Sequence, residues 1–279
     1  PETNWQWMLG VMALPAALFA VLLFTVPESP RWLTKQGLTD RAKDVLSKIR
    51  HNVGDELQDI KDSLTHCEQK SIPLFQKKYT KPLLIAFFIA TFNQFTGINA
   101  FLYYAPTIFK EAHAPEKMTL MLPILIGVVM IVFTMVGMLS VDKIGRKGLL
   151  FIGCAGMSIS LAVASYGFFA NIYYVYTFIA LMIFTAFFTM SQGTVIWVII
   201  SEVFPTDVRA KGQTFGSMTH WAWNSVLVYA LPVAFSYTNG ASILFGIFAA
   251  MMLACFLYTF TLPNTNNKSL EQIQKELGC

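Results

Sequence analysis

Uncharged polar side chains gather inside apolar stretches of the sequence, where such groups are costly and usually line a cavity or hold helices together. The densest group is formed by three carboxamides, Asn93, Gln94 and Asn99, with Gly97 between them. Carboxamides donate and accept hydrogen bonds, so they suit a ligand with neighbouring hydroxyl groups. On a straight helix Asn99 would lie about 140° away from Gln94, so the amides can share a cavity only if the helix is distorted around Gly97. The alternative is that they join helices, at about 0.6 kcal/mol per contact.

A second polar group combines an imidazole, an indole and an amide. His220, Trp223 and Asn224 follow the spacing i, i+3, i+4, which places them on one helix face. Trp221 points elsewhere on an ideal helix, to another wall or to lipid, while Trp197 lies in a further apolar stretch beside polar neighbours. Neutral amides and indole faces are typical of a site for a neutral polyhydroxylated ligand. A charged ligand would favour a buried carboxylate or arginine, and the apolar stretches contain neither.

His220 has two possible roles. A neutral imidazole would hydrogen-bond a ligand hydroxyl, whereas an imidazole that titrates near neutral pH would make ligand binding pH-dependent. Its apolar neighbours favour the neutral form, and no carboxylate lies in the same stretches. We expect a hydrogen-bonding His220 with no part in proton coupling.

The elements that carry these residues are predicted from the distribution of charge. Of the 279 residues, 55% are hydrophobic and 13% are charged, against roughly 25% charged in soluble domains. Because a membrane span needs about 20 apolar residues, the charge-free stretches hold seven spans, two in each of the two longest, and exclude a soluble fold. The stretches are 3–27, 82–109, 118–141, 148–201 and 212–267.

Lysine and arginine predict how the spans are oriented. Eighteen lie in segments that alternate to one membrane face, against Lys110 and Lys117 on the other. The positive-inside rule makes the first face cytoplasmic, so the net charge of +4 requires no nucleic acid. The segments predicted to be cytoplasmic are 28–81, 142–147, 202–211 and the C-terminus. The predicted domains are a last helix of an N-terminal half (1–27), a linker (28–81), a six-helix bundle (82–262) and a tail (263–279).

The predicted linker contains short amphipathic helices. Over 39–50 the apolar residues Ala42, Val45, Leu46 and Ile49 recur with helical spacing. A second stretch uses Leu57, Ile60 and Leu64. Helices this short are marginal alone, so we expect them to dock on the cytoplasmic ends of the spans.

Three of the cytoplasmic segments carry a carboxylate followed by an arginine. The pairs are Glu28 with Arg31, Asp142 with Arg146, and Glu202 with Arg209. Arginine presents a planar fork that fits a carboxylate. A surface ion pair contributes about 0–1 kcal/mol, a size that suits a latch that opens in every cycle. Nothing in the pattern points to covalent catalysis, a metal or another cofactor; Cys154 and Cys255 lie within apolar stretches without metal-ligand spacing.

The ordered motifs resemble a sugar porter of the major facilitator superfamily. They are 27–33 (PESPRWL), 93–99 (NQFTGIN) with Tyr103 and Tyr104, 142–147 (DKIGRK), and Glu202 with Pro205 and Arg209. The resemblance implies an all-α membrane protein of twelve helices, of which this chain would supply helices six to twelve as a fragment.

The resemblance also implies a function and a site. The implied function is transport of a monosaccharide, a hexose or a pentose, by alternating access, either as a proton symporter or as a facilitative uniporter. The carrier would lie in a plasma or bacterial inner membrane and work as a monomer. Its partners would be the sugar, the lipid bilayer and possibly protons as the coupling ion. The alternatives are a transporter-like sugar sensor and a carrier for a polyol or another small metabolite. The implied sugar-binding residues are Asn93, Gln94, Asn99, Tyr103, Trp197, His220, Trp221 and Asn224.

This sequence departs from the family pattern at several of these positions. Asn93 stands where the family has glutamine, His220 where it has an amide, and Met130 where it has asparagine. Thr194 replaces the proline of a Gly-Pro pair, so we expect a less pronounced kink there. In the tail, Asn264 replaces a latch carboxylate. These departures bear on the substrate rather than on the fold.

Overall fold

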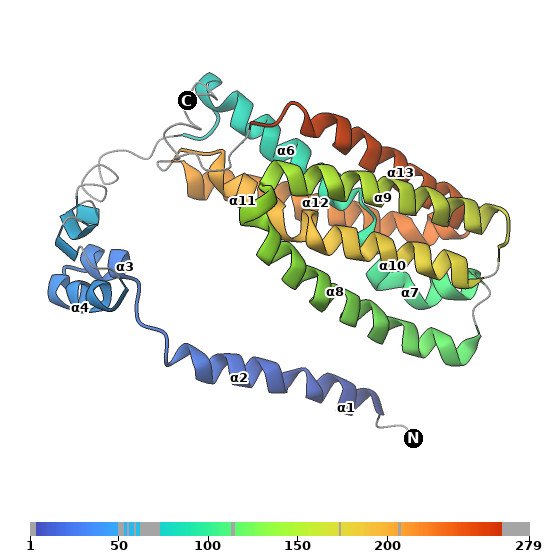
Figure 1. Cartoon of the computed structure of the whole chain (residues 1–279), viewed down its shortest axis with the longest axis horizontal. Coiled ribbons are helices and arrows are strands. Elements are labelled where there is room, and N and C mark those ends of the chain that lie inside the picture. Colours follow the sequence, from blue (N-terminus) through green and yellow to red (C-terminus); the bar gives the residue numbers. More distant parts are fainter. Residues whose placement is uncertain are drawn as a thin grey trace. The chain divides into compact units, whose positions relative to one another are not determined.

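The computed structural model divides the chain into two compact units, Pro1–Ser71 and Ile72–Cys279 (Figure 1). The division falls inside the predicted linker 28–81, whose two boundaries stay predictions. The tail 264–279 lies outside the described residues. The residues described are 4–49, 53–54, 56–58, 60–61, 73–112, 115–172, 174–205 and 208–263.

The first unit begins with a helix that matches the first predicted span. Helices α1 (Asn4–Val11) and α2 (Ala13–Leu23) are separated by Met12, which itself has right-handed helical angles (φ −65°, ψ −21°). Twenty helical residues would extend about 30 Å, the thickness of the bilayer core. Helix α2 buries no side chain within the described part of the chain. A helix that is apolar on all sides is suited to lipid or to packing against other membrane helices.

The rest of the first unit contains the amphipathic helices of the linker. Helix α3 (Pro30–Lys35) is followed by α4 (Thr39–Ile49), which confirms the helix predicted over 39–50. Leu33, Ala42, Leu46 and Leu57 form a small buried cluster, so these elements pack their apolar faces on one another. Leu64 lies outside the described residues, and docking on the spans stays a prediction.

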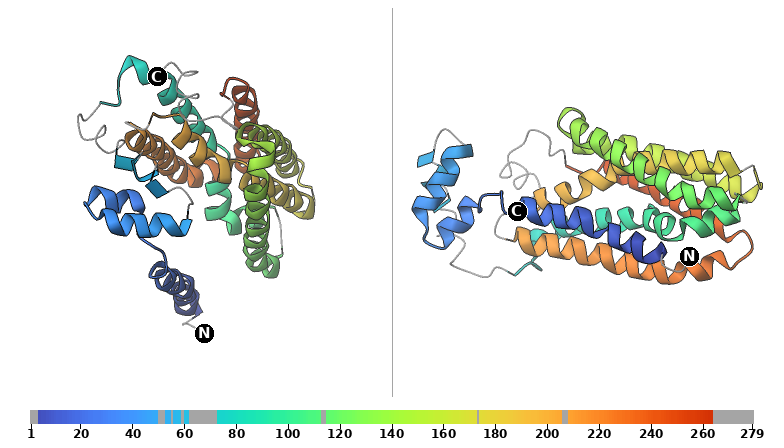
Figure 2. Two further views of the ribbon diagram at one scale, coloured as in Figure 1. Left: turned by 60° about the vertical axis from the view of Figure 1, so that its left-hand side comes forward. Right: turned by 90° about the horizontal axis from the view of Figure 1, so that it is seen from below.

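The second unit is a bundle of long helices. No strand occurs in the described ranges. After a short 3-10 turn (Lys77–Tyr79), the helices are α6 (Thr80–Gln94), α7 (Ile98–Glu111), α8 (Glu116–Ile144), α9 (Arg146–Phe169), α10 (Tyr174–Met190), α11 (Gln192–Glu202), α12 (Arg209–Phe235) and α13 (Gly240–Thr259). Helix α9 packs closely between α10 and α13, and α6 packs against α12 (Figure 2).

Five helical segments of the described chain are long and apolar enough to cross a membrane. They are Lys77–Glu111, Met121–Ile144, Arg146–Phe169, Tyr174–Glu202 and Gly240–Thr259. Helix α12 is 27 residues long, but its central polar residues lower its hydropathy. The seven predicted spans thus correspond to these five, to α12 and to the α1–α2 pair, and the crossing of the last two stays a prediction.

The distortion predicted at Gly97 is present as a full break between α6 and α7. Gly97 has φ +81°, and a Cβ added there would fall on the ring of Phe248, so the position requires glycine. Thr96 satisfies backbone groups that the break exposes. Its hydroxyl donates to the carbonyl of Asn93 (2.7 Å) and accepts from the N–H of Ile98 (3.2 Å). Such side-chain bonds make non-helical backbone tolerable at membrane depth.

A second break separates α10 from α11 at Ser191 (φ −112°, ψ −86°). The Thr194 hydroxyl donates across the break to the carbonyl of Thr189 at 2.8 Å. The helix is interrupted here although Thr194 stands where the family has proline, and whether the kink is less pronounced than with proline stays a prediction. The hydroxyl of Thr194 reaches a carbonyl that the break releases, so the interruption persists without a proline.

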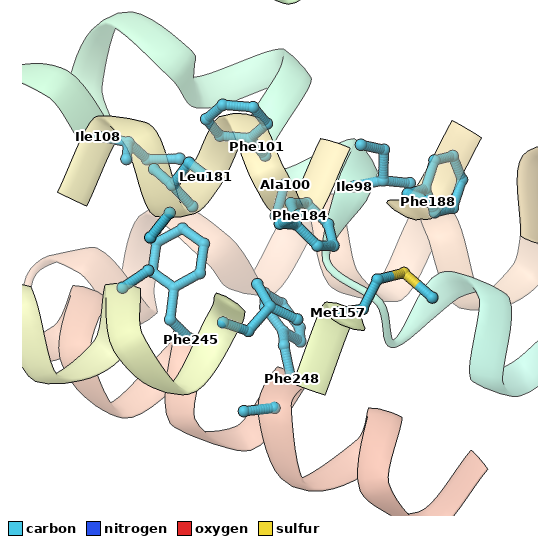
Figure 3. Close-up of a cluster of buried hydrophobic side chains, with 14 of the residues drawn as sticks. Ile98, Ala100, Phe101, Ile108, Met157, Leu181, Phe184, Phe188, Phe245 and Phe248 are labelled. Atoms are coloured by element: carbon cyan, nitrogen blue, oxygen red, sulfur yellow. The ribbon is translucent and has the colours of Figure 1, made fainter. Parts of the chain in front are cut away.

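Aromatic side chains fill the core beside the two breaks. Phe101, Phe184, Phe245 and Phe248 are all buried and come from α7, α10 and α13 (Figure 3). Phe101 meets Phe184 edge-to-face with 6.3 Å between ring centroids, and Phe245 meets Phe248 edge-to-face at 6.2 Å. These large rings hold the broken helices in fixed positions, since edge-to-face pairs pack with defined geometry.

Candidate functional site

A cavity of about 330 Å³ lies beside both helix breaks. It has the size of a small-molecule site, and none of the described residues that line it is an aspartate, glutamate, lysine or arginine. The lining residues are Asn93, Ile98, Asn99, Leu102, Met130, Thr134, Phe188, Thr189, Gly193, Trp197, His220 and Trp221. A larger cavity of about 430 Å³ is lined by residues that include Glu111 and Asn171, but by none of the predicted site residues.

Asn99 is the centre of an amide network that joins three helices. Its Nδ2 donates to Oε1 of Gln94 at 3.0 Å and to Oδ1 of Asn224 at 2.9 Å. The break at Gly97 removes the 140° separation of a straight helix and brings Asn99 back to Gln94. Gln94 is 1% exposed, and among the described residues its Nε2 has no hydrogen-bond partner.

Asn93 lines the cavity and is held from behind by a residue that the sequence analysis did not single out. Its Nδ2 donates to Oε1 of Gln192 at 3.2 Å, and both residues are buried. On the other side, Nε2 of Gln192 lies 3.5 Å from the sulfurs of Cys154 and Cys255 and 3.6 Å from that of Met252. A buried glutamine in a membrane helix was the available sequence signal, but its partners lie far away in the sequence.

His220 stands between two indole rings at the cavity wall. Its ring centroid is 5.0 Å from that of Trp197 and 5.3 Å from that of Trp221, both in edge-to-face geometry. The helical wheel directed Trp221 to another wall or to lipid, and its side chain, 57% exposed, lies on the cavity lining. The cavity covers an arc of α12 wide enough to contact two consecutive side chains, which an ideal helical wheel separates by about 100°. Nδ1 of His220 is buried without a partner among the described residues.

The other two residues of the predicted α12 face join α12 to α6 and α7 and do not line the cavity. Nε1 of Trp223 donates to the hydroxyl of Thr91 at 3.1 Å, and its ring meets Phe95 edge-to-face. Asn224 accepts the hydrogen bond from Asn99. The residues predicted to share one face are therefore divided: His220 lines the cavity, whereas Trp223 and Asn224 contact neighbouring helices.

The structure does not bring Tyr103 into the cavity. Its side chain is 53% exposed and is absent from the lining, although the family resemblance placed it in the site. Met130 does line the cavity, so this departure puts a thioether where the family has an amide. Thr134 and Thr189 also line it and were not predicted, since isolated threonines in spans give little signal.

At one end of the same bundle, Arg146 forms the central ion pair. Its guanidinium lies 3.3 Å from a carboxylate oxygen of Glu202 and 3.8 Å from Asp142. Arg146 and Glu202 are 22% and 17% exposed, whereas Asp142 is 84% exposed. Lys147 lies beside them and donates to the carbonyls of Phe260 (3.0 Å) and Leu262 (2.7 Å). The first residues of α9 and the last residues of α11 and α13 therefore meet at one end of the unit.

One of the predicted ion pairs is corrected, and another stays a prediction. Glu202 was paired with Arg209, but it contacts Arg146 from another loop, and Nε of Arg209 donates to the carbonyl of Phe204 at 3.4 Å. Helices α9, α10 and α11 lie between the two segments along the chain, and both segments lie at the same end of the bundle, so a carboxylate of one can pair with an arginine of the other. In the first unit, Glu28 lies 3.8 Å from Arg41. Its predicted partner Arg31 has a side chain outside the described set.

Comparison with known proteins places this geometry in a family. The model described as "Sugar (and other) transporter" matches residues 2–277. The arabinose-proton symporter of Bacillus subtilis is 36% identical over 98% of this chain and 60% of its own length. The D-xylose-proton symporter of Escherichia coli is 33% identical over 97% of this chain and 57% of its own length. This chain thus spans about three fifths of these relatives.

A solved structure agrees with the sequence matches. The proton:xylose symporter XylE, bound to 6-bromo-6-deoxy-D-glucose, aligns with a TM-score of 0.81 and 33% identity, over 98% of this chain and 59% of the other. The inward-open conformation of the xylose transporter XylE from E. coli aligns with a TM-score of 0.73. The chain therefore belongs to the sugar transporter family, as part of a multi-pass membrane protein with the all-helical fold of the major facilitator superfamily.

Proposed function

We propose that this chain forms the substrate-binding half of a carrier that moves a neutral monosaccharide across the membrane in symport with protons. The observation that carries the proposal is the uncharged cavity at the two helix breaks. Its wall combines the amides of Asn93 and Asn99, the imidazole of His220 and the indoles of Trp197 and Trp221. Amides exchange hydrogen bonds with vicinal hydroxyls, and indole faces cover the apolar side of a sugar ring.

The substrate class is a pentose or a hexose. The relatives named for arabinose and xylose transport, each with proton symport, favour a pentose and favour coupling over facilitated uniport. Within the sequence-implied site, Asn93, Gln94, Asn99, Trp197, His220, Trp221 and Asn224 hold or support the ligand, and Tyr103 is left out because of its place outside the cavity. No covalent chemistry is required.

Transport by alternating access uses the breaks and the charged end of the bundle. Discontinuous helices are the way secondary transporters build binding sites at the midplane. In this proposal the pair of Arg146 with Glu202 acts as a latch at the cytoplasmic end of the bundle. The other residues of the predicted gate, on the cytoplasmic side of the membrane, are Glu28, Arg31, Asp142 and Arg209. In this proposal 28–81, 142–147, 202–211 and the C-terminus are cytoplasmic, residues 82–262 form the C-terminal bundle, and the carrier works as a monomer in the lipid bilayer.

The test is uptake into vesicles by the full-length carrier. Purified protein is reconstituted into liposomes, and uptake of labelled arabinose, xylose and glucose is measured with and without an imposed proton gradient, acid on the extracellular side. We expect the gradient to accumulate one of these sugars above its external concentration, and a protonophore to abolish the accumulation.

Equilibration without accumulation would assign a facilitative uniporter. Sugar binding without any uptake would favour the sensor, and uptake of a polyol without any sugar would favour the polyol carrier. An absence of both binding and uptake for neutral sugars would contradict the proposal as a whole.

A further inference from the structure

We infer that Gln192 is a positioning residue that fixes the amide of Asn93 as a hydrogen-bond acceptor toward the ligand, so that the site selects a hydroxyl donor at that point. The inference rests on the proposed function, because it concerns how the same cavity recognises its sugar. Gln192 itself is 1% exposed and does not line the cavity, so it acts through Asn93.

The orientation of the Gln192 amide is set by the sulfur atoms behind it. Three sulfurs lie within 3.6 Å of its Nε2, from Cys154, Cys255 and Met252. A thioether sulfur accepts hydrogen bonds and has no proton to donate, so the group facing Met252 must be the amide N–H. The amide oxygen of Gln192 is therefore directed to the opposite side, toward Asn93.

The orientation of Asn93 follows from that of Gln192. Because Oε1 of Gln192 can only accept, Asn93 must present its Nδ2, and the two atoms are 3.2 Å apart. A flipped Asn93 would place two carbonyl oxygens against each other inside the bundle, where water does not screen them. Among the described residues no group donates to Oδ1 of Asn93, which leaves this oxygen to the cavity.

The amide of Asn99 also presents its oxygen, a hydrogen-bond acceptor, to the ligand, but for a different reason. Its Nδ2 carries two protons, and these are directed to Gln94 and Asn224. Its Oδ1 is therefore also the atom left for a ligand. The amides of Asn93 and Asn99 could each donate or accept hydrogen bonds, but both are restricted to accepting one from the ligand. At Asn93 this restriction depends on Gln192.

A ligand group opposite Asn93 must then be a donor. A sugar hydroxyl meets this requirement, whereas a fluorine or a methoxy oxygen at the same carbon has no proton to donate. A site that hydrogen-bonds a ligand group discriminates strongly against an analogue without it, because its own buried polar atom is left unpaired.

The experiment compares a sugar with its monodeoxy-monofluoro analogues. The full-length carrier is purified, the sugar that it transports is used as probe, and the affinity for each analogue is measured by competition. The variants are Gln192→Met, which keeps the unbranched shape without the amide oxygen, and Gln192→Glu, which keeps an oxygen facing Asn93. Thr185→Val is the matched control, because Thr185 is buried and bonds to its own helix at Leu181.

We expect one analogue to bind the wild type at least tenfold more weakly than the sugar. In Gln192→Met this ratio should fall to about twofold, because a released Asn93 can turn its N–H to the fluorine. Gln192→Glu and Thr185→Val should keep the wild-type ratio. Gln192→Leu carries the same prediction as Gln192→Met if the methionine variant does not fold.

Two outcomes would overturn the inference. One is a wild-type protein that binds every fluoro analogue as tightly as the sugar. The other is a Gln192→Met protein that loses affinity for all ligands equally and keeps every ratio, which would reduce Gln192 to a packing role. A wild type that binds no sugar at all would instead contradict the proposed function.

Discussion

The two ends of helix α11 carry different kinds of polar group, a neutral amide at one end and a charged carboxylate at the other. At its first residue, Gln192 belongs to a network of neutral amides around the cavity, and at its last residue, Glu202 belongs to an ion pair with Arg146. The two residues are about 15 Å apart along the helix. Charge is tolerated where water can reach the helix end, while the interior uses groups that bond one another without carrying charge.

This difference suggests separate roles for the two regions. The amide network fixes the donors and acceptors that a ligand meets, so changes there should alter affinity and selectivity. In the proposed latch the ion pair opens and closes at modest energy, so changes there should alter which side of the carrier is accessible. The following predictions test this division, from the largest expected effect to the smallest.

The largest effect is expected for Asn99→Ala. The change removes a ligand contact and leaves Oε1 of Gln94 and Oδ1 of Asn224 without their donor. The sugar hydroxyl that Asn99 would contact is then buried without a partner, at a cost of about 1–3 kcal/mol, which corresponds to a roughly 5- to 150-fold loss of sugar affinity. The measurement is the apparent affinity of uptake in vesicles, with Ser160→Ala as control, because the Ser160 hydroxyl bonds to its own helix. Unchanged affinity would reduce the network to a link between helices.

An intermediate effect is expected for Arg146→Ala. Glu202, whose side chain is 17% exposed in the intact pair, would lose its 3.3 Å partner. The free energy lost with this ion pair should lie between that of a surface pair and that of a buried pair. We therefore expect the rate at which a reagent on the cytoplasmic side alkylates a cysteine placed in the cavity to rise about tenfold.

The matched control for this prediction is Asp142→Asn. Asp142 lies 3.8 Å from the same arginine but is 84% exposed, so labelling should stay within about twofold of the wild type. Equal labelling in Arg146→Ala and in the wild type, with only expression or orientation altered, would assign Arg146 to membrane topology and remove the latch.

The smallest effect is expected at His220. Its imidazole lies between two indoles, and no carboxylate of the described residues lines the cavity with it. We expect a neutral hydrogen-bonding role, so His220→Gln should keep uptake and its pH profile. His220→Leu should weaken binding about fivefold at every pH, since it removes the hydrogen bond. A His220→Gln protein that binds sugar but no longer accumulates it would place His220 on the proton path.

The sequence predicted the parts of this molecule that depend on local composition. Charge-free stretches mark the spans because the bilayer excludes charge, and Gly97 beside three amides marks the break because its backbone conformation disfavours other residues. The helix over 39–50 followed from apolar spacing. Each of these features is decided within one segment of the chain.

The partners between helices could not be predicted in the same way. The contacts of Asn93 with Gln192 and of Arg146 with Glu202 join residues far apart in the sequence. Local spacing paired Glu202 with Arg209 because it cannot represent two loops that meet in space. The helical wheel left open whether Trp221 faces another wall or lipid, because a wheel does not show how wide an arc of α12 the cavity covers.

The central claim is that the ligand occupies the uncharged cavity, and cysteine protection tests it most directly. Met130→Cys places a thiol on the cavity lining without removing a hydrogen-bonding residue, in a carrier whose other cysteines are replaced by alanine. Its alkylation rate by a membrane-permeant maleimide is measured at rising concentrations of the transported sugar. Ile159→Cys, at an exposed position on α9 outside the cavity lining, is the control. We predict that the sugar slows labelling of Met130→Cys at least tenfold, with half-protection at the affinity for uptake, and leaves Ile159→Cys unchanged. Equal labelling of Met130→Cys with and without saturating sugar, in a variant that still transports it, would contradict the account.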